Sequence, residues 1–137
     1  MLPVAALPAD RTTEFLDLIK PVFPQFVAAD NVWTTSVNNV NPIVHPPMVL
    51  FNAGRIEATG GNGWNLYADG ATECVTLVMM AMDAERMALL GLVSNDGVAL
   101  KDTFENFYTK YSIGKQTLSE SLRQSPIHGS PLFPAPS

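Results

Sequence analysis

The chain has 137 residues, of which 47% are hydrophobic and 15% are charged. This length allows one folded unit to bury a core, and the apolar content excludes an intrinsically disordered protein. The formal net charge of -5 argues against binding to nucleic acid, because phosphate recognition requires a basic surface.

The opening third of the chain predicts one α/β unit. Residues 2–9 form a short apolar run bounded by prolines, which is typical of an edge strand or a loop. A helix is expected to follow as far as Lys20, with Asp10 or Thr12 as its N-cap. Residues 27–37 carry the β-branched and aromatic side chains of a second strand. Parallel strands normally pair with further strands, so we expect the rest of such a sheet outside this chain.

From Met48 onward the pattern predicts helices, over residues 48–58, 72–93, 100–111 and 117–123. The first two are separated by the glycine-rich turn Gly60–Gly63. The helix over 72–93 is apolar almost all round, which predicts a central, buried position. The third is amphipathic and is expected to turn four aromatic side chains inward: Phe104, Phe107, Tyr108 and Tyr111. The last helix opens with the capping-box pattern Thr117-Leu118-Ser119-Glu120.

No apolar run reaches the roughly 20 residues needed to cross a bilayer, because Asp83, Glu85 and Arg86 interrupt the longest candidate. The N-terminus also lacks the charged start and continuous apolar stretch of a secretory signal. We therefore expect a cytoplasmic protein that binds neither a membrane nor nucleic acid.

The chain has one cysteine and two histidines. A single cysteine excludes an internal disulfide, and the apolar helical surroundings of Cys74 predict a buried, inert thiol. His45, Cys74 and His128 lie too far apart in sequence to suggest a metal site. His128 falls within residues 125–137, a proline-rich stretch interpreted as an unstructured tail with a solvated histidine.

Asn41 precedes His45 by four residues, which is about one helical turn. If the backbone is helical there, the amide and the imidazole can address one small ligand. Three prolines, Pro42, Pro46 and Pro47, restrict the backbone around the histidine and make its position stiff. On the residues alone, two interpretations stay open: an active-site histidine, or a histidine that caps the start of a helix.

Four further stretches carry a likeness to a known family: Asn38–Pro46, Leu50–Glu57, Leu66–Gly70 and Met82–Arg86, with Leu7–Ala9 and Phe23–Phe26 upstream. Together they resemble the opine dehydrogenases, the octopine/nopaline dehydrogenase family. The likeness covers roughly residues 1–124.

The resemblance implies an oxidoreductase acting on a CH–NH bond, which joins an amino acid to a 2-oxo acid and reduces the imine with NAD or NADP. It implies a mainly α fold, in which a helical substrate domain similar to the C-terminal domain of 6-phosphogluconate dehydrogenase covers residues 41–124. Residues 1–40 would be the last α/β unit of a Rossmann nucleotide-binding domain, and 125–137 the tail. His45 matches the acid/base histidine of the family, and Asn41 matches its substrate-site asparagine.

The chain departs from the family in two respects. The Gly-x-Gly-x-x-Gly fingerprint is absent, so no cofactor-binding residue is assigned. The family's aspartate partner of the histidine, in a segment shaped like Arg-Tyr-x-x-Glu-Asp, is also absent. We therefore expect this chain to be inactive alone, whether as a fragment, as half of a split enzyme with a separate Rossmann chain, or as a degenerate copy.

Two non-enzymatic interpretations stand beside the dehydrogenase. One is a small-molecule binding module that keeps the amino-acid or 2-oxo-acid pocket. The other is a helical interaction domain that self-associates, because a partial Rossmann unit exposes apolar surface.

Overall fold

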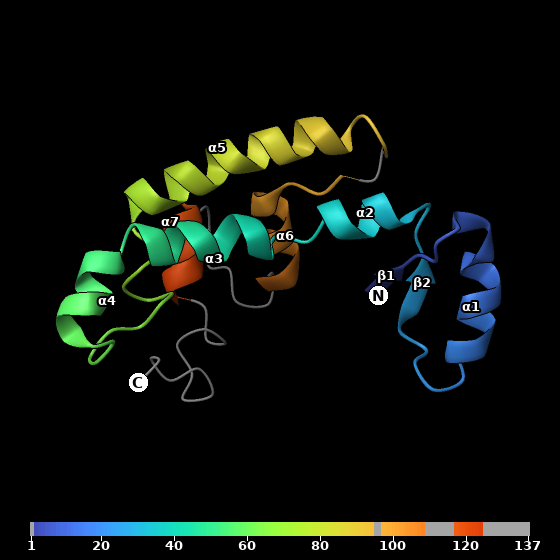
Figure 1. The fold of residues 1–137 in the computed structure, drawn as a ribbon, viewed down its shortest axis with the longest axis horizontal. Helices are drawn as coiled ribbons and strands as arrows, with labels where there is room; N and C mark the ends of the chain where they lie inside the picture. Colours follow the sequence, from blue (N-terminus) through green and yellow to red (C-terminus); the bar gives the residue numbers. More distant parts are fainter. Residues whose placement is uncertain (1, 95–96, 109–116, 125–137) are drawn as a thin grey trace. The chain divides into compact units, whose positions relative to one another are not determined.

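The structure is a computed structural model, which describes residues 2–94, 97–108 and 117–124 (Figure 1). These residues are mainly helical, with a small two-stranded sheet near the N-terminus, as predicted. The chain divides into two compact units. The first unit comprises Met1–Val40 and Glu85–Val98, and the second comprises Asn41–Ala84 and the described residues from Ala99 onward. The division expected from the resemblance, with residues 1–40 as part of a nucleotide-binding domain and 41–124 as the helical domain, stays a prediction.

The first unit contains the predicted strand–helix–strand segment. Strand β1 (Leu2–Val4) pairs in parallel with β2 (Phe26–Ala28), and α1 (Thr12–Ile19) connects them after the short 3-10 helix η1 (Ala9–Arg11) (Figure 1). The expected N-cap is wrong, because α1 begins without a side-chain cap. Instead, the buried Thr12 hydroxyl accepts a hydrogen bond of 3.0 Å from the Ala6 N–H, which holds the turn after β1.

The strand predicted over residues 27–37 is wrong beyond its first two residues. Residues Val32–Val37 form helix α2. Asn31 lies in an extended conformation, and its side-chain oxygen accepts a hydrogen bond of 3.0 Å from the Thr34 N–H. This N-cap satisfies a backbone donor at the start of the helix and outweighs the β preference of the side chains that follow.

The helix expected over 48–58 is also wrong in its bounds. Helix α3 (Asn41–Leu50) begins seven residues earlier and passes through Pro46 and Pro47, and a separate α4 covers Ala53–Thr59. The break lies at Asn52, whose amide donates 2.7 Å to the Met48 carbonyl in place of a helical N–H. Gly60, with a φ of 59°, ends α4 in the left-handed region that glycine adopts without strain.

Helix α5 (Glu73–Leu90) is the longest helix of the described residues, but it is not buried all round. Its buried side chains follow one face at helical spacing: Val75, Thr76, Met79, Asp83, Arg86 and Leu90. Leu77 and Leu89, on the other side, are 60% and 63% exposed. Cys74 is exposed as well, so the prediction of a buried thiol is wrong. Helix α5 therefore carries more apolar side chains than the rest of the described structure covers.

Helices α6 (Leu100–Tyr108) and α7 (Leu118–Gln124) follow. The first residue of α6 donates its N–H to the Asp83 carboxylate at 2.8 Å. The predicted capping box before α7 is confirmed, since Thr117 and Glu120 exchange backbone-to-side-chain hydrogen bonds of 2.8 and 3.2 Å. The pKa of the Glu120 carboxyl is lowered by the hydrogen bonds that it accepts from the Thr117 N–H and from the Thr117 hydroxyl.

Phe104 is buried as expected, whereas the side chains of Phe107, Tyr108 and Tyr111 lie outside the described part. The proline-rich stretch 125–137 lies outside it too.

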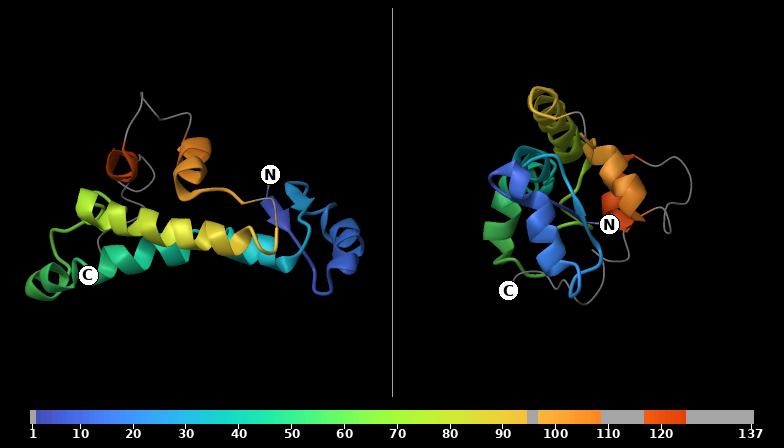
Figure 2. Two further views of the ribbon diagram at one scale, coloured as in Figure 1. Left: turned by 90° about the horizontal axis from the view of Figure 1, so that it is seen from above. Right: turned by 90° about the vertical axis from the view of Figure 1, so that its right-hand side faces the viewer.

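The core of the second unit is formed mainly by apolar side chains. Helix α3 and the first part of α5 lie side by side, both in Figure 1 and in the view from above in Figure 2. Among the described residues of this unit, eight side chains are at most 2% exposed: Val44, Met48, Trp64, Ala71, Met79, Leu100, Ser119 and Leu122. Because the apolar side chains of α3 are buried in this core, the rotation of the helix about its own axis is fixed. This rotation determines where the face that carries Asn41 and His45 points. None of the described helices is long and apolar enough to span a membrane.

Candidate active site

Asn41 and His45 both lie in helix α3, at the separation of one turn that the sequence predicted. Asn41 is the first residue of the helix and is exposed, whereas His45 is half-buried. The helical backbone that their joint action requires is therefore present. Their roles in substrate binding and proton transfer stay predictions.

The prolines around His45 lie inside a continuous helix. Pro46 and Pro47 have no N–H, so the carbonyls of Pro42 and Ile43 receive no hydrogen bond from the usual residue four positions later. The loss of two helical bonds is offset by burial of the neighbouring side chains, because Ile43, Val44, Pro47 and Met48 are all buried. Buried neighbours on both sides hold the backbone of His45 in place.

The imidazole of His45 contacts the phenol of Tyr67. Its Nε2 lies 2.7 Å from the Tyr67 hydroxyl oxygen, which is the distance of a hydrogen bond. The two rings meet edge to face, with centroids 6.0 Å apart and planes inclined by 79°. Burial raises the pKa of the Tyr67 phenol, which therefore keeps its proton at neutral pH.

Tyr67 is held by the turn in which it lies. The Asn65 side-chain oxygen accepts hydrogen bonds from the N–H groups of Tyr67 and Ala68, at 3.0 and 2.8 Å. The Asp69 carboxylate in turn accepts a bond of 2.8 Å from the Asn65 N–H. Arg123 of α7 donates to the Ala68 carbonyl at 2.8 Å. The backbone that presents the phenol to His45 is thus fixed from several directions.

Tyr67 was assigned no role from the sequence, although it lies in one of the stretches that carry the family likeness. The local signal for its position is the pair Asn65 and Asp69, two turn-forming residues four positions apart. That signal predicts a rigid turn around the tyrosine. It does not predict the contact with a histidine 22 positions earlier.

Two carboxylates of the second unit accept hydrogen bonds from backbone N–H groups. Asp69 closes the turn around Tyr67, and Asp83 caps α6. Within the part of the chain that the structure describes, His45 has no carboxylate partner, and the Tyr67 hydroxyl takes the place at Nε2.

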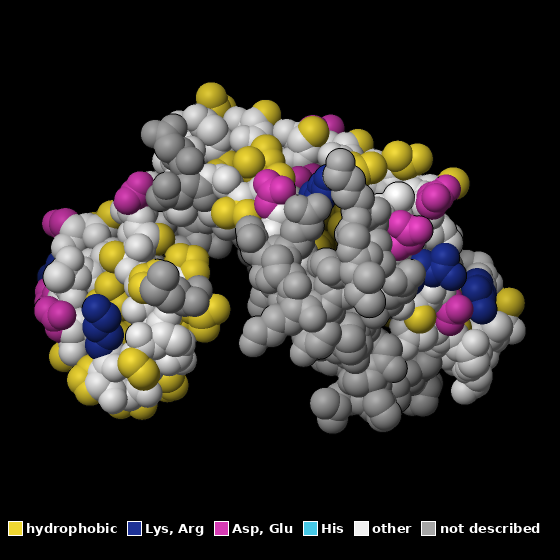
Figure 3. Space-filling view, turned by 180° about the vertical axis from the view of Figure 1, so that it is seen from behind, with side chains coloured by type: hydrophobic (Ala, Val, Ile, Leu, Met, Phe, Trp, Pro, Cys, Tyr) yellow, Lys and Arg dark blue, Asp and Glu magenta, His cyan; other side chains and the backbone are white. Residues whose placement is uncertain are grey.

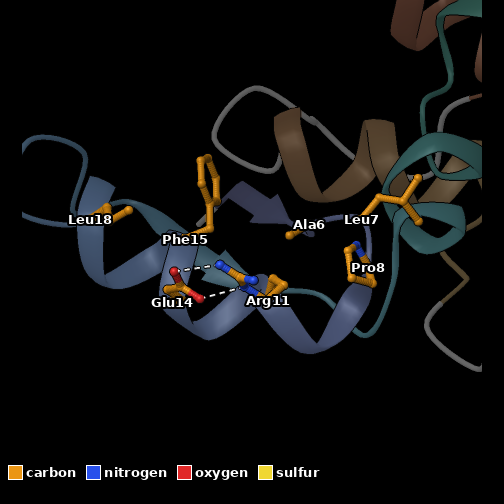
Figure 4. A pocket seen from close by; sticks show the side chains of 7 residues that line it. All are labelled: Ala6, Leu7, Pro8, Arg11, Glu14, Phe15 and Leu18. Atoms are coloured by element: carbon orange, nitrogen blue, oxygen red, sulfur yellow. Dashed lines mark hydrogen bonds and ion pairs between the residues drawn. The ribbon is translucent and has the colours of Figure 1, made fainter.

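A separate pocket of about 360 Å³ lies in the first unit, at the start of α1 (Figure 4). It is lined by Ala6, Leu7, Pro8, Arg11, Glu14, Phe15 and Leu18. Its two charged side chains, Arg11 and Glu14, pair with each other at 2.6 Å and are both more than half exposed (Figure 4). Neither Asn41 nor His45 lines this pocket.

The nicotinamide coenzyme implied by the resemblance needs a site for its pyrophosphate, and the described residues do not fit one. The turn between β1 and η1 contains no glycine, since it consists of Ala5, Ala6, Leu7 and Pro8. Gly60–Gly63 follow a helix, α4, and not a strand. The strand–turn–helix arrangement with glycines that cradles a dinucleotide is therefore not formed by these residues.

Comparison with known proteins gives two results. The family model described as NAD/NADP octopine/nopaline dehydrogenase, alpha-helical domain, matches residues 28–136. An opine dehydrogenase of Arthrobacter sp. (strain 1C) is 32% identical over 124 residues, which is 90% of this chain and 33% of that protein. This chain thus spans about a third of the length of that relative. The chain belongs to the octopine/nopaline dehydrogenase family, and the match falls on the alpha-helical domain.

Proposed function

We propose that this chain provides the substrate-binding and catalytic helical domain of an NAD- or NADP-dependent opine dehydrogenase. In this reaction the amino group of an amino acid condenses with the carbonyl of a 2-oxo acid, and the imine is reduced to a secondary amine. The observation that carries the proposal is the placement of Asn41 and His45 one turn apart on α3, in a chain of this family.

His45 is the proton-transfer residue of the proposal. When the C–N bond forms, the amine loses protons and the carbonyl oxygen gains them and leaves as water. A half-buried imidazole held by a hydrogen bond suits proton transfer, because a ring nitrogen can give or take a proton from a fixed position. The stiff backbone around it keeps the ring where a substrate would meet it.

Asn41 is the proposed orienting residue. Its amide can donate to a carbonyl or carboxylate oxygen of the 2-oxo acid from the turn that precedes His45. Because the amide is uncharged, its contribution is alignment of the reacting carbonyl and not a change of its protonation.

The nucleotide-binding part is proposed to come from outside these residues, either in the same polypeptide or in a separate Rossmann chain. The support is the apolar surface of the first unit, which Figure 3 shows at its left side. Leu7, Leu18 and Val22 are 83%, 73% and 70% exposed, and they lie in the segment that connects the two parallel strands. Parallel sheets are normally covered and extended by further strands. The cytoplasmic location expected from the sequence stays a prediction.

The proposal is tested by NAD(P)H oxidation with pyruvate and a panel of amino acids. The chain is assayed alone and with a nucleotide-binding domain of the family, supplied separately or fused. We expect turnover only in the second case. His45→Gln should then lower kcat about a hundredfold or more, through loss of acid/base catalysis. His128→Gln, which removes the other histidine of the chain, is the matched control.

Equal turnover of His45→Gln and the control would remove His45 from the reaction. Calorimetry with pyruvate and the same amino acids, without coenzyme, separates the binding-module alternative: heat of binding together with no turnover in any reconstituted form would favour it over the enzyme.

A further inference from the structure

We propose that Tyr67 is the positioning residue of His45: its hydroxyl donates to Nε2, so that the neutral ring carries its proton on Nδ1 and presents this N–H to the substrate as a donor. This inference rests on the proposed function for its last step. The hydrogen bond from Tyr67 to Nε2 and the tautomer of the ring are properties of the chain itself, and they do not depend on any activity.

The geometry of the pair supports a specific hydrogen bond. The 2.7 Å between Nε2 and the phenol oxygen is at the short end of the usual range for a bond between nitrogen and oxygen. The edge-to-face arrangement of the rings packs the imidazole against the phenol in addition to the bond. Both side chains are half-buried, so water competes less for either partner than at an exposed pair.

The direction of the bond follows from the chemistry of the two groups. A neutral imidazole has one nitrogen with a proton and one without, and the nitrogen without a proton is a good acceptor. A phenol is a much stronger acid than a neutral imidazole N–H, so the pair is most stable when the phenol donates. Burial raises the pKa of Tyr67 and keeps that donor proton in place. The ring proton then belongs on Nδ1, because the partner of one nitrogen decides the state of the other.

The consequence for the site is a choice between the two nitrogens. Nε2 is occupied by Tyr67, whereas Nδ1 forms no hydrogen bond with any part of the chain that the structure describes. A substrate that reaches this ring without displacing Tyr67 therefore meets the Nδ1–H group. A ring protonated on both nitrogens can pass the Nδ1 proton to the substrate, and the Nε2–H that remains then donates to the Tyr67 oxygen. The turn around Asn65 fixes the phenol, so this assignment does not depend on a freely rotating side chain.

The test is the tautomer of His45 in the full 137-residue chain, measured by long-range ¹H–¹⁵N NMR at about pH 9, where imidazoles are neutral. The chain has only two histidines, and His45→Gln identifies the signals of His45. We expect the wild type to show a protonated Nδ1 and an unprotonated Nε2. Tyr67→Phe keeps the ring but removes the hydroxyl, and it should shift the proton substantially toward Nε2.

The control is Thr59→Val, which removes a hydroxyl bonded to the Arg55 carbonyl of its own helix and should leave the tautomer unchanged. Circular dichroism establishes that each variant is folded. A wild-type ring with its proton on Nε2 would overturn the proposal, and this measurement does not require any variant to fold. A folded Tyr67→Phe variant with an unchanged tautomer would overturn it as well.

In the reconstituted enzyme, Tyr67→Phe should lower kcat about tenfold to a hundredfold and change KM less than about threefold, because a misoriented ring affects proton transfer more than binding. If the chain proves inactive in every reconstituted form, the proposed function fails while the tautomer result stands. If the enzyme is active and the tautomer is the reverse, the role of Tyr67 fails while that of His45 stands.

Discussion

Asn52 and Gly70 are joined by a hydrogen bond of 3.1 Å from the Asn52 amide to the Gly70 carbonyl, across 18 positions of sequence. The same amide nitrogen donates to the Met48 carbonyl at 2.7 Å. One side chain thus links the end of α3 to the turn that carries Tyr67. This link requires a close approach of the backbone at Gly70, where an added Cβ would meet the Leu66 carbonyl oxygen and lie 2.9 Å from the Trp64 ring.

Gly70→Ala is therefore expected to destabilise the chain by about 3 kcal/mol, because neither the backbone oxygen nor the enclosed indole can move away easily. Gly54→Ala is the matched control. Gly54 lies within α4, and an added Cβ meets nothing within 4 Å, so alanine should stabilise by about 0.5–1 kcal/mol. Urea unfolding of both variants checks the pair. Equal stability of the two variants would contradict the close approach at Gly70.

Asn41→Ala should reduce kcat/KM for the 2-oxo acid about tenfold to a hundredfold in the reconstituted enzyme, the range expected for one hydrogen bond to a substrate carbonyl or carboxylate. Asn41 is the exposed first residue of α3, and urea unfolding of the variant separates an effect on substrate binding from an effect on stability. Asn62→Ala is a control, since Asn62 is an exposed asparagine in the turn after α4 that donates to the Thr59 carbonyl. Steady-state kinetics at varied concentrations of the oxo acid distinguish the two variants. Identical kinetics of Asn41→Ala and Asn62→Ala would show that Asn41 does not bind the substrate.

Tyr67 makes stability depend on pH in the alkaline range. Its pKa in the folded chain is raised by burial above the ordinary value of 10.0, so the unfolded chain loses this proton first as the pH rises. The free energy of unfolding contains a contribution that is complete below pH 10.0 and is lost as the pH rises through the pKa of the folded state. Tyr67→Phe should lose this part of the pH dependence. Urea unfolding of both proteins between about pH 8 and 11 measures the difference, and parallel curves would contradict it.

Arg86 is predicted to be the most important cation for the stability of the first unit. It is only 6% exposed, and its guanidinium donates to the carbonyls of Val37 and Val98 at 2.9 and 2.6 Å. Arg86→Met keeps the length of the side chain but leaves both carbonyls without this donor, which should cost about 2–4 kcal/mol.

Arg11→Met is the control for that variant. Arg11 pairs with Glu14 at 2.6 Å, but the two side chains are 62% and 60% exposed, and such surface pairs contribute less than about 1 kcal/mol. Thermal unfolding of both variants distinguishes the two arginines. A Tm of Arg86→Met as high as that of Arg11→Met would show that the two carbonyl contacts contribute little.

The local sequence pattern was sufficient for elements whose signals lie within one or two turns. The strand–helix–strand order, although not the extent of its second strand, follows from residue composition over a few positions. The long α5 and the capping box of Thr117 and Glu120 follow from periodicity and from a local cap. The one-turn separation of Asn41 and His45 is of the same kind, because it depends only on a helical backbone.

Other features depended on side chains that lie far away in sequence. Helix α3 continues through Pro46 and Pro47 because the burial of Val44 and Met48 compensates for the missing hydrogen bonds. The exposure of Cys74 depends on which face of α5 finds packing partners, and composition does not reveal that.

By itself, the sequence determined the helical class, the family and the pair of residues that α3 presents. The tertiary structure alone decided that Nε2 of His45 meets the hydroxyl of Tyr67, and that Gly70 and Asn52 hold the segment bearing that tyrosine. The physical reason is that a hydrogen bond between distant residues depends on how helices and turns pack, and packing is set by the whole core and not by any local pattern.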